Sequence, residues 1–146
     1  MCRTVNFDNL TPANILPDNI ISTGNVTFSR FNSVTEDGSS IVGVVSPPGA
    51  LINIAGSAYI TGYGTQTFPI DLRSLYMTAI GSNVTVTING IGKFDNVVKN
   101  LTTHLVANVV TYMPLSGFVN LMQAEILTGA DSDRFLLDNV VVRRSS

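Results

Sequence analysis

The sequence predicts an all-β protein, a two-sheet antiparallel jelly-roll β-sandwich of about eight or nine strands, with residues 1–146 as a single domain. Several short stretches alternate apolar and polar residues with the period of two that a half-buried strand requires. Turn-forming residues separate these stretches at short intervals, as in sandwiches and barrels. No segment longer than a turn and a half has the apolar spacing of an amphipathic helix. A chain of this length can bury a core of its own.

The clearest strand covers residues 83–88, where every second residue is apolar. Another alternating stretch begins at Phe68, and its phase shifts at Arg73-Ser74, which predicts a β-bulge or a sharp bend there. The same criteria predict strands over 4–7, 25–31, 41–45, 50–54, 103–113, 122–128 and 134–143. Turns are predicted at 36–39, 47–49, 62–64, 89–90, 116–117 and 129–131, because Gly, Pro, Asn and Asp gather there.

The composition excludes some classes of protein. Charged residues make up only 12% of the chain and the net charge is −2, without a cluster of Lys or Arg, so nucleic acid is not an expected partner. The polar residues of the surface are expected to come instead from the 28 Ser and Thr residues and the 14 Asn residues.

The sequence also gives no sign of a membrane-spanning segment, because it has no run of 18 apolar residues. No apolar stretch follows the N-terminus, so either the protein stays inside the cell or a signal peptide has already been removed. We expect the second case, a secreted or cell-surface protein.

Both ends of the chain resemble a known group of domains. The opening segment 5–10, Val-Asn-Phe-Asp-Asn-Leu, and the closing segment 133–142 are similar to the end strands of secreted β-jelly-roll domains found in exported bacterial and fungal proteins. Residues 68–79 and 85–90 resemble middle strands of the same group. These domains are similar to the galactose-binding-like fold of many carbohydrate-binding modules. The group often has a Trp in its first third, and this chain has none.

The resemblance implies that the first and last strands lie close together, which would bring Asp8 and Asp138 near each other. Asp138 shares its strand face with apolar residues, and a carboxylate in such surroundings needs compensation. Ca²⁺ would supply it, since hard cations prefer oxygen ligands, and the resemblance implies a structural calcium at this place. Alternatively, these carboxylates bond to their own backbone at strand ends.

A second candidate site is the segment 62–66, where Tyr63 lies between glycines. A tyrosine that projects from a loop can stack on a sugar ring, and Thr65 and Gln66 can bond to its hydroxyl groups. Alternatively, the glycines serve a tight turn and Tyr63 packs back on the sandwich. We interpret the other three tyrosines as core or sheet-surface residues: Tyr59, Tyr76 and Tyr112.

No catalytic constellation is recognisable. His104 is the one histidine and lacks metal-ligating neighbours, so it is expected on a sheet face without a catalytic role. Asp131 and Asp133 lie too close in one loop, with Glu125 upstream, for the opposed carboxylates of a glycosidase. Cys2 is the single cysteine, so it is either an unpaired thiol or part of an intermolecular link. Sequons such as those at Asn25, Asn83 and Asn100 permit glycosylation without arguing for it.

The sequence therefore predicts a secreted, non-catalytic binding module for a carbohydrate, such as a cell-wall or surface glycan. Lectin-like recognition of this kind would combine aromatic stacking with hydrogen bonds. The alternative is a structural or protein-binding jelly roll that self-assembles into a coat, shell or surface layer, because its apolar strands carry few charges that oppose association. A homo-oligomer is compatible with both interpretations.

Overall fold

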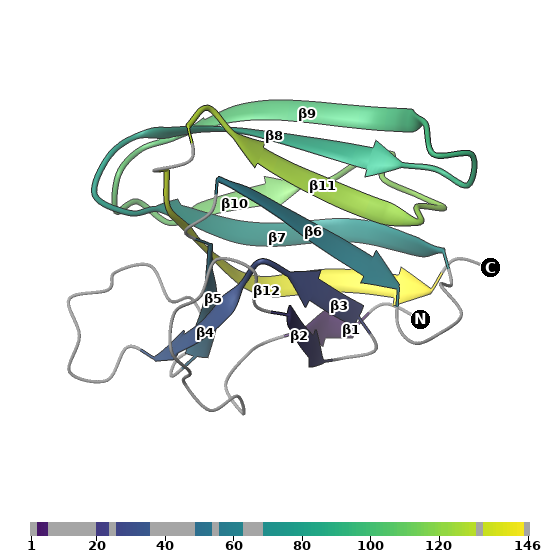
Figure 1. Ribbon diagram of the computed structural model, residues 1–146, viewed down its shortest axis with the longest axis horizontal. Helices are drawn as coiled ribbons and strands as arrows, with labels where there is room; N and C mark the ends of the chain where they lie inside the picture. The colour runs from purple at the N-terminus through teal and green to yellow at the C-terminus, as the bar shows by residue number, and fades with distance from the viewer. Residues whose placement is uncertain are drawn as a thin grey trace.

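The computed structural model describes residues 3–5, 20–23, 26–35, 49–53, 56–62, 69–130 and 133–144, and they form two antiparallel sheets packed face to face (Figure 1). The predicted all-β sandwich is confirmed. Twelve strands are present in these residues, more than the eight or nine expected, because five of them are only three or four residues long. The described residues contain strands and loops, with no helix that is long and apolar enough to cross a membrane.

The first sheet, sheet A, has β7 and β12 at its centre. Its order is β10–β7–β12–β5–β4, and β1 also pairs with β12. The first and last strands are therefore neighbours, as the resemblance implied. The strands are β1 (Arg3–Val5), β4 (Asn32–Thr35), β5 (Gly49–Asn53), β7 (Ile70–Ala79), β10 (Thr111–Pro114) and β12 (Phe135–Arg144).

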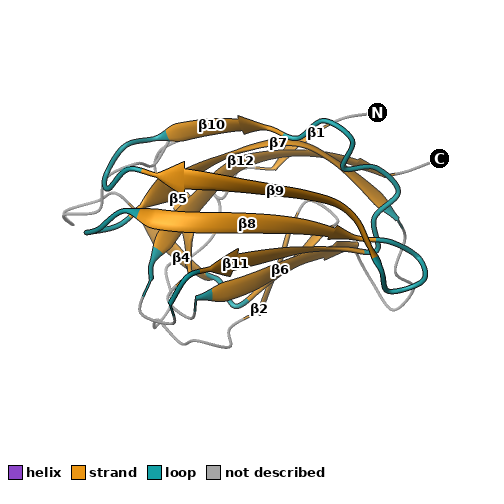
Figure 2. Cartoon of the chain, turned by 90° about the horizontal axis from the view of Figure 1, so that it is seen from above, coloured by secondary structure: helices purple, strands orange, loops and turns teal. Residues whose placement is uncertain are grey.

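The second sheet, sheet B, has the order β2–β3–β6–β11–β8–β9. Its strands are β2 (Ile20–Thr23), β3 (Val26–Ser29), β6 (Ser57–Gly62), β8 (Val84–Ile91), β9 (Val97–Leu105) and β11 (Gln123–Thr128). Figure 2 shows β9, β8, β11 and β6 as one layer below the layer of β10, β7 and β12. The edge strands β9 and β10 lie at the same side of the sandwich.

The core lies between the sheets and consists of apolar side chains that alternate inward along each strand. In β8 the inward residues Val84, Val86 and Ile88 are buried and the residues between them are not, as the alternation predicted. Three aromatic rings in contact connect the two sheets. The ring of Phe31 contacts Phe28 at the end of β3, with centroids 6.2 Å apart, and Phe135 of β12, at 5.9 Å, both edge to face.

The irregularity predicted at Arg73-Ser74 is present. β7 continues through this point, but its pairing with β12 shifts register on both sides of the Ser74–Val141 pair. Opposite it, Asn139 has a φ of 45°, a left-handed conformation that Asn tolerates better than most residues. The shift lets Leu72 and Leu75 both face the core although they are three residues apart.

The turn predicted at Asn89-Gly90 is wrong, because both residues lie inside β8. The β8–β9 turn comes later, at Gly92–Asn96, where Asp95 takes a φ of 61°. Gly90 lets two core side chains pack closely against the backbone of β8. A Cβ at this position would lie 2.8 Å from Cδ2 of Leu121 and 3.2 Å from Cδ2 of Phe118. A glycine in a strand marks the close approach of a neighbouring segment.

The strand predicted over 103–113 is also wrong, because this stretch belongs to two strands in different sheets. β9 ends at Leu105, and β10 begins at Thr111. Between them the chain crosses from sheet B to sheet A, with a φ of 62° at Asn108, whose N–H donates to the carbonyl of Ala79 at 2.8 Å. The predicted strand at 41–45 and the predicted turns at 36–39 and 47–49 lie outside the described residues.

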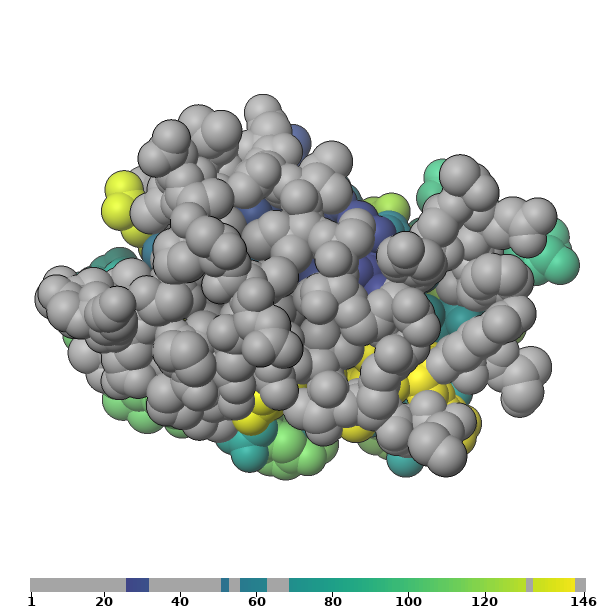
Figure 3. All heavy atoms as spheres, turned by 90° about the horizontal axis from the view of Figure 1, so that it is seen from below, coloured from purple at the N-terminus to yellow at the C-terminus, as the bar shows by residue number. Residues whose placement is uncertain are grey.

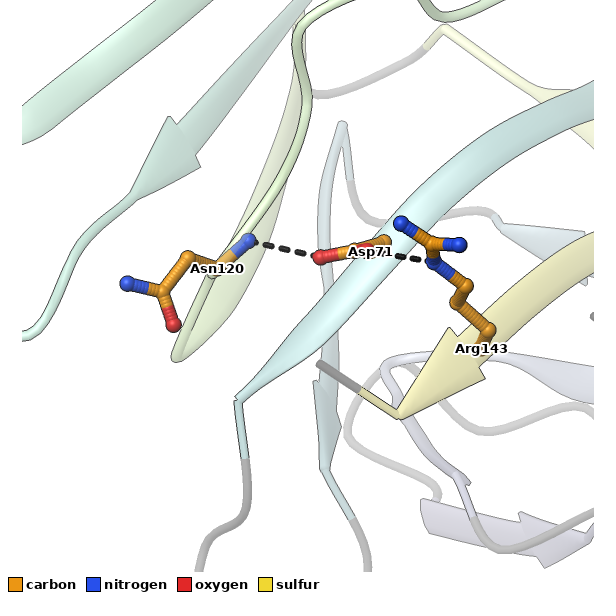
Figure 4. A network of polar contacts seen from close by, with 3 residues as sticks. All are labelled: Asp71, Asn120 and Arg143. Carbon is orange, nitrogen blue, oxygen red and sulfur yellow. Dashed lines mark hydrogen bonds and ion pairs between the residues drawn. The ribbon is translucent and has the colours of Figure 1, made fainter. Parts of the chain in front are cut away.

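A buried carboxylate ties the end of the chain to the β10–β11 loop (Figure 4). Asp71 of β7 is 4% exposed; its Oδ2 is 2.6 Å from Nε of Arg143 on β12, and its Oδ1 accepts the N–H of Asn120 at 2.8 Å. Asn120 has a φ of 55°, so the carboxylate holds a turn of unfavourable backbone geometry. Arg143 stays partly exposed, and Figure 3 shows yellow atoms of β12 at the surface.

Replacing Arg143 with methionine is expected to lower the free energy of unfolding by about 1.5–3 kcal/mol, the usual loss for a hydrogen bond to a charged group. A value near the lower limit is expected, because the Arg143 side chain is 42% exposed and the surrounding water weakens its attraction to Asp71. Urea denaturation followed by circular dichroism measures the change. Arg134→Met is the matched control, since Arg134 is exposed, and equal losses in both variants would contradict this role for the ion pair.

Candidate functional site

Two tyrosines form an exposed aromatic pair on the outer face of sheet A. Tyr112 of β10 lies directly opposite Tyr76 of β7, and their ring centroids are 5.1 Å apart with an angle of 51° between the planes. Tyr112 is 54% exposed, whereas Tyr76 is partly buried. The strand neighbours Thr111 and Met113 point the other way, and Met113 is in the core. The pair offers an aromatic surface to a ligand without loss of core packing.

A groove with a volume of about 280 Å³ lies further along the same two strands, in the direction of the β10–β11 loop. It is lined by Arg73, Pro114, Leu115, Ser116, Gly117 and Val119. Pro114 stands two residues from Tyr112 in β10, and residues two apart in a strand share a face, so one side of the groove lies next to the tyrosine pair along β10.

The groove carries polar groups of the kind that bind hydroxyl groups. Arg73 is exposed, and it makes no ion pair within the part of the chain that the structure describes. Its own carbonyl accepts the N–H of Leu115 at 2.9 Å, which fixes the loop against β7. Gly117, with a φ of 84°, turns the loop as the sequence predicted at 116–117. Aromatic rings next to a guanidinium and a hydroxyl group make a surface suited to a sugar ring and its hydroxyls.

Asp138 extends the row of the two tyrosines. It lies opposite Tyr76 across the β7–β12 pairing, and it is 1% exposed. Its Oδ1 accepts the N–H of Asn139 at 2.8 Å, which is the local backbone bond considered as the alternative to calcium. Ca²⁺ takes six to eight oxygen ligands, and a single carboxylate such as Asp138 supplies two at most. Among the described residues, no three His, Cys, Asp or Glu side chains gather so that they could hold a metal ion. Asp8 lies outside the described residues, so the calcium site stays a prediction.

The predicted loop site, Tyr63 with Thr65 and Gln66, also lies outside the described residues, directly after the last residue of β6, Gly62. The aromatic pair was not predicted, although both tyrosines were placed on strands. The alternation around Tyr112 indicated a residue on one face of a strand. Only the pairing of β10 with β7 shows that Tyr76 lies beside it.

The outer face of sheet B is a second polar surface with one aromatic residue. A row across five strands joins Ser29, Tyr59, Glu125, Asn89 and Asn100. Within it, Nδ2 of Asn89 donates to Oε1 of Glu125 at 3.3 Å. The guanidinium of Arg30 lies 5.8 Å from the centroid of the Tyr59 ring, so a cation already occupies one ring face. We therefore favour the tyrosine pair of sheet A for stacking.

The titratable residues considered for catalysis are in separate places. His104 lies on the exposed face of β9, as expected, where its Nδ1 is 2.9 Å from Oγ1 of Thr85. Glu125 is on β11, in the middle of sheet B. Oδ2 of Asp133 accepts the N–H of Ala130 at 3.0 Å and closes a local turn, and Asp131 lies outside the described residues. These described groups have structural partners and do not face one another across a cleft.

No family model matches the chain, and no curated protein matches it. Among solved structures, a DUF4465 family protein from Bacteroides caccae is similar over 99% of this chain and 100% of that chain, with a TM-score of 0.69 at 11% identity. A GH51 α-L-arabinofuranosidase in complex with arabinose is similar over 94% of this chain and 25% of that chain, with a TM-score of 0.53 at 16% identity. A family 29 carbohydrate-binding module aligns at a TM-score of 0.47 and 10% identity, over 100% of this chain and 94% of that chain.

At these identities the first two similarities establish a shared fold and no more, and the third is too distant to carry an argument. The DUF4465 structure is matched over its full length. In the arabinofuranosidase the matching part is about a quarter of a larger enzyme. The class that the fold defines is therefore a β-sandwich of the kind found alone and as a module of larger proteins.

Proposed function

We propose that this chain is a non-catalytic carbohydrate-binding module. The Tyr76–Tyr112 pair, which lies along the same two strands as the groove of Arg73 and Ser116, is the observation that carries the proposal. Sugar rings have apolar faces that stack on tyrosine, and their hydroxyl groups bond to arginine and serine side chains. The groove is smaller than a typical pocket of about 300–1,000 Å³ for a drug-sized ligand. The volume of the groove therefore fits one or two sugar units of a longer glycan.

The ligand is a cell-wall or surface glycan, and the protein is secreted or displayed at the cell surface. The low charged fraction of 12% supports a neutral or weakly charged ligand rather than nucleic acid. The second sequence-based site, Tyr63 with Thr65 and Gln66, is retained as a rival location for the same function. A coat or shell protein is the alternative function, and the exposed apolar edge of sheet B favours self-association.

A screen of the purified protein against soluble glycans and insoluble polysaccharides, with and without Ca²⁺, tests the proposal. Saturable binding to a carbohydrate that is competed by its soluble fragments is the expected result. The absence of binding across cell-wall polymers and surface glycans would overturn the proposed function. The non-catalytic assignment is tested by incubating the protein with each glycan that it binds and separating the products by chromatography. A module without catalytic groups leaves the glycan uncut.

A structural calcium ion at Asp138 and Asp8 remains part of the proposal. A ligand that binds only the native state raises its stability by mass action. EDTA is therefore expected to lower the melting temperature of the wild-type protein and to have no effect on Asp138→Asn, which keeps the Oδ1 acceptor for Asn139. An unchanged wild-type melting curve, together with elemental analysis that finds no calcium, would rule the ion out.

A further inference from the structure

Exposed apolar side chains gather at the two ends of one strand, β9. Six large apolar residues between positions 94 and 110 are 42–85% exposed, and Phe94 is the most exposed of them. Three precede or begin β9 and three follow its end: Phe94, Val97 and Val98, then Val106, Val109 and Val110. Only Asp95 and Lys99 carry a full charge in this stretch. Soluble monomers seldom leave so many neighbouring apolar side chains in water.

β9 is also an edge strand with few of the usual protections. It pairs with β8 on one side, and no other strand of the described residues lies on its far side (Figure 1). It is nine residues long, and almost all of its side chains are partly or fully exposed. The free N–H and C=O groups of such an edge can pair with another strand, and proteins usually prevent this with charges, prolines or short edges. Lys99 is the one charged residue within β9.

We propose that β9 pairs antiparallel with β9 of a second copy, about a two-fold axis close to Leu101. An antiparallel arrangement reverses one strand, so the beginning of each strand meets the end of the other. The cluster at Phe94 and Val98 of one copy then lies near the cluster at Val106 of the second copy. A two-fold interface requires this kind of self-complementary surface.

The side chains along the strand are compatible with this register. With Leu101 on the axis, Asn100 lies opposite Thr102 of the second copy, and both belong to the polar outer face of sheet B. Lys99 lies opposite Thr103 of the second copy, so the two lysines do not face each other. Like charges directly opposite would have opposed the pairing. Leu105, which closes the core, lies opposite Val97 of the second copy.

The size of the surface fits a dimer. A standard interface buries about 800 Å² per partner, with an apolar centre and polar groups around it. From their exposed fractions, the six apolar side chains offer on the order of several hundred Å² of apolar surface, and the polar side chains along the edge of β9 surround it. The two copies of sheet B would form one continuous sheet. The tyrosine pairs remain on the outer faces of the two copies of sheet A, where both are free to bind a glycan.

Size-exclusion chromatography with light scattering, over a range of protein concentrations, tests the proposal. The wild-type protein is expected to be a dimer, and Val98→Lys and Val109→Lys are expected to weaken the dimer at least tenfold, because each places a charge in an apolar contact. Both residues are exposed, so both variants are expected to stay folded. Their circular dichroism spectra should match that of the wild-type protein, and each should unfold in one cooperative transition. Ala130→Lys is the matched control, since Ala130 is exposed and follows β11, which β8 separates from β9.

The position of the axis has its own test. Asn100→Cys, made together with Cys2→Ser, is expected to be linked efficiently by a short thiol-reactive crosslinker, whereas Ala130→Cys in the same background is not. A wild-type protein that is monomeric at all concentrations would overturn the proposal. So would a dimer that both lysine variants leave intact. The oligomeric state and the crosslink are both measured without any glycan, so a failed glycan screen leaves these results standing and a monomer leaves the glycan screen standing.

Discussion

Replacing Tyr112 with alanine is expected to weaken glycan binding at least tenfold, a loss of about 1.4 kcal/mol or more in binding free energy. Tyr112 is the more exposed ring of the pair, so its truncation removes the stacking surface and leaves Tyr76 without its neighbour. Aromatic side chains are often the residues that carry most of an interface's binding energy. The fold is expected to tolerate the change, because 54% of the side chain is already in water. Isothermal titration calorimetry with the glycan identified in the screen measures the effect.

Two further variants locate the binding site among its rivals. Tyr59→Ala removes the aromatic residue from the outer face of sheet B, and Tyr63→Ala removes the one in the segment that follows β6 in the sequence. Both are expected to bind the glycan with wild-type affinity. A loss with Tyr63→Ala and not with Tyr112→Ala would move the site to the loop predicted from the sequence. A loss with Tyr59→Ala alone would move it to the polar row of sheet B.

Replacing Phe31 with alanine is expected to lower the free energy of unfolding by about 3–5 kcal/mol, the usual cost of a phenylalanine-sized cavity in a core. Phe31 is fully buried and contacts an aromatic ring in each layer: Phe28 at the end of β3 and Phe135 in β12. Its loss therefore leaves a void and breaks two edge-to-face contacts, each worth about 0.5–1.5 kcal/mol beyond the area they bury. Few single residues connect the two sheets as directly.

Urea denaturation, followed by far-UV circular dichroism at one low protein concentration, measures this loss. Phe94→Ala is the control, since the same truncation at a side chain that is 85% exposed is expected to change stability by less than about 0.5 kcal/mol. The low concentration keeps self-association from contributing to either value. Equal losses for the two phenylalanines would show that the aromatic contacts at Phe31 do not hold the layers together.

Local pattern was enough to predict the architecture, because a strand that is buried on one face must alternate. The alternation in 83–88 predicted β8, and the shift of phase at Arg73-Ser74 predicted the irregularity in β7 before any partner strand was known. β6 was missed over Ser57–Gly62, because its buried positions are occupied by small residues as well as by Ile60, and the apolar signal is weak. The candidate site was less predictable, since Tyr76 and Tyr112 are 36 positions apart and neither has a motif around it.

The sequence by itself therefore determined that strands build a sandwich and where most of the longer strands lie, because alternation and turn residues act over a few positions. Tertiary structure alone decided the roles of particular residues. Asn89-Gly90 has the composition of a turn, but Leu121 and Phe118 pack so closely on Gly90 that it belongs inside a strand. The stretch 103–113 looks continuous, yet Leu105 and Thr111 belong to different sheets. The pairing of Tyr76 with Tyr112 depends on the register of β7 and β10, and register is set by contacts between segments far apart in the chain.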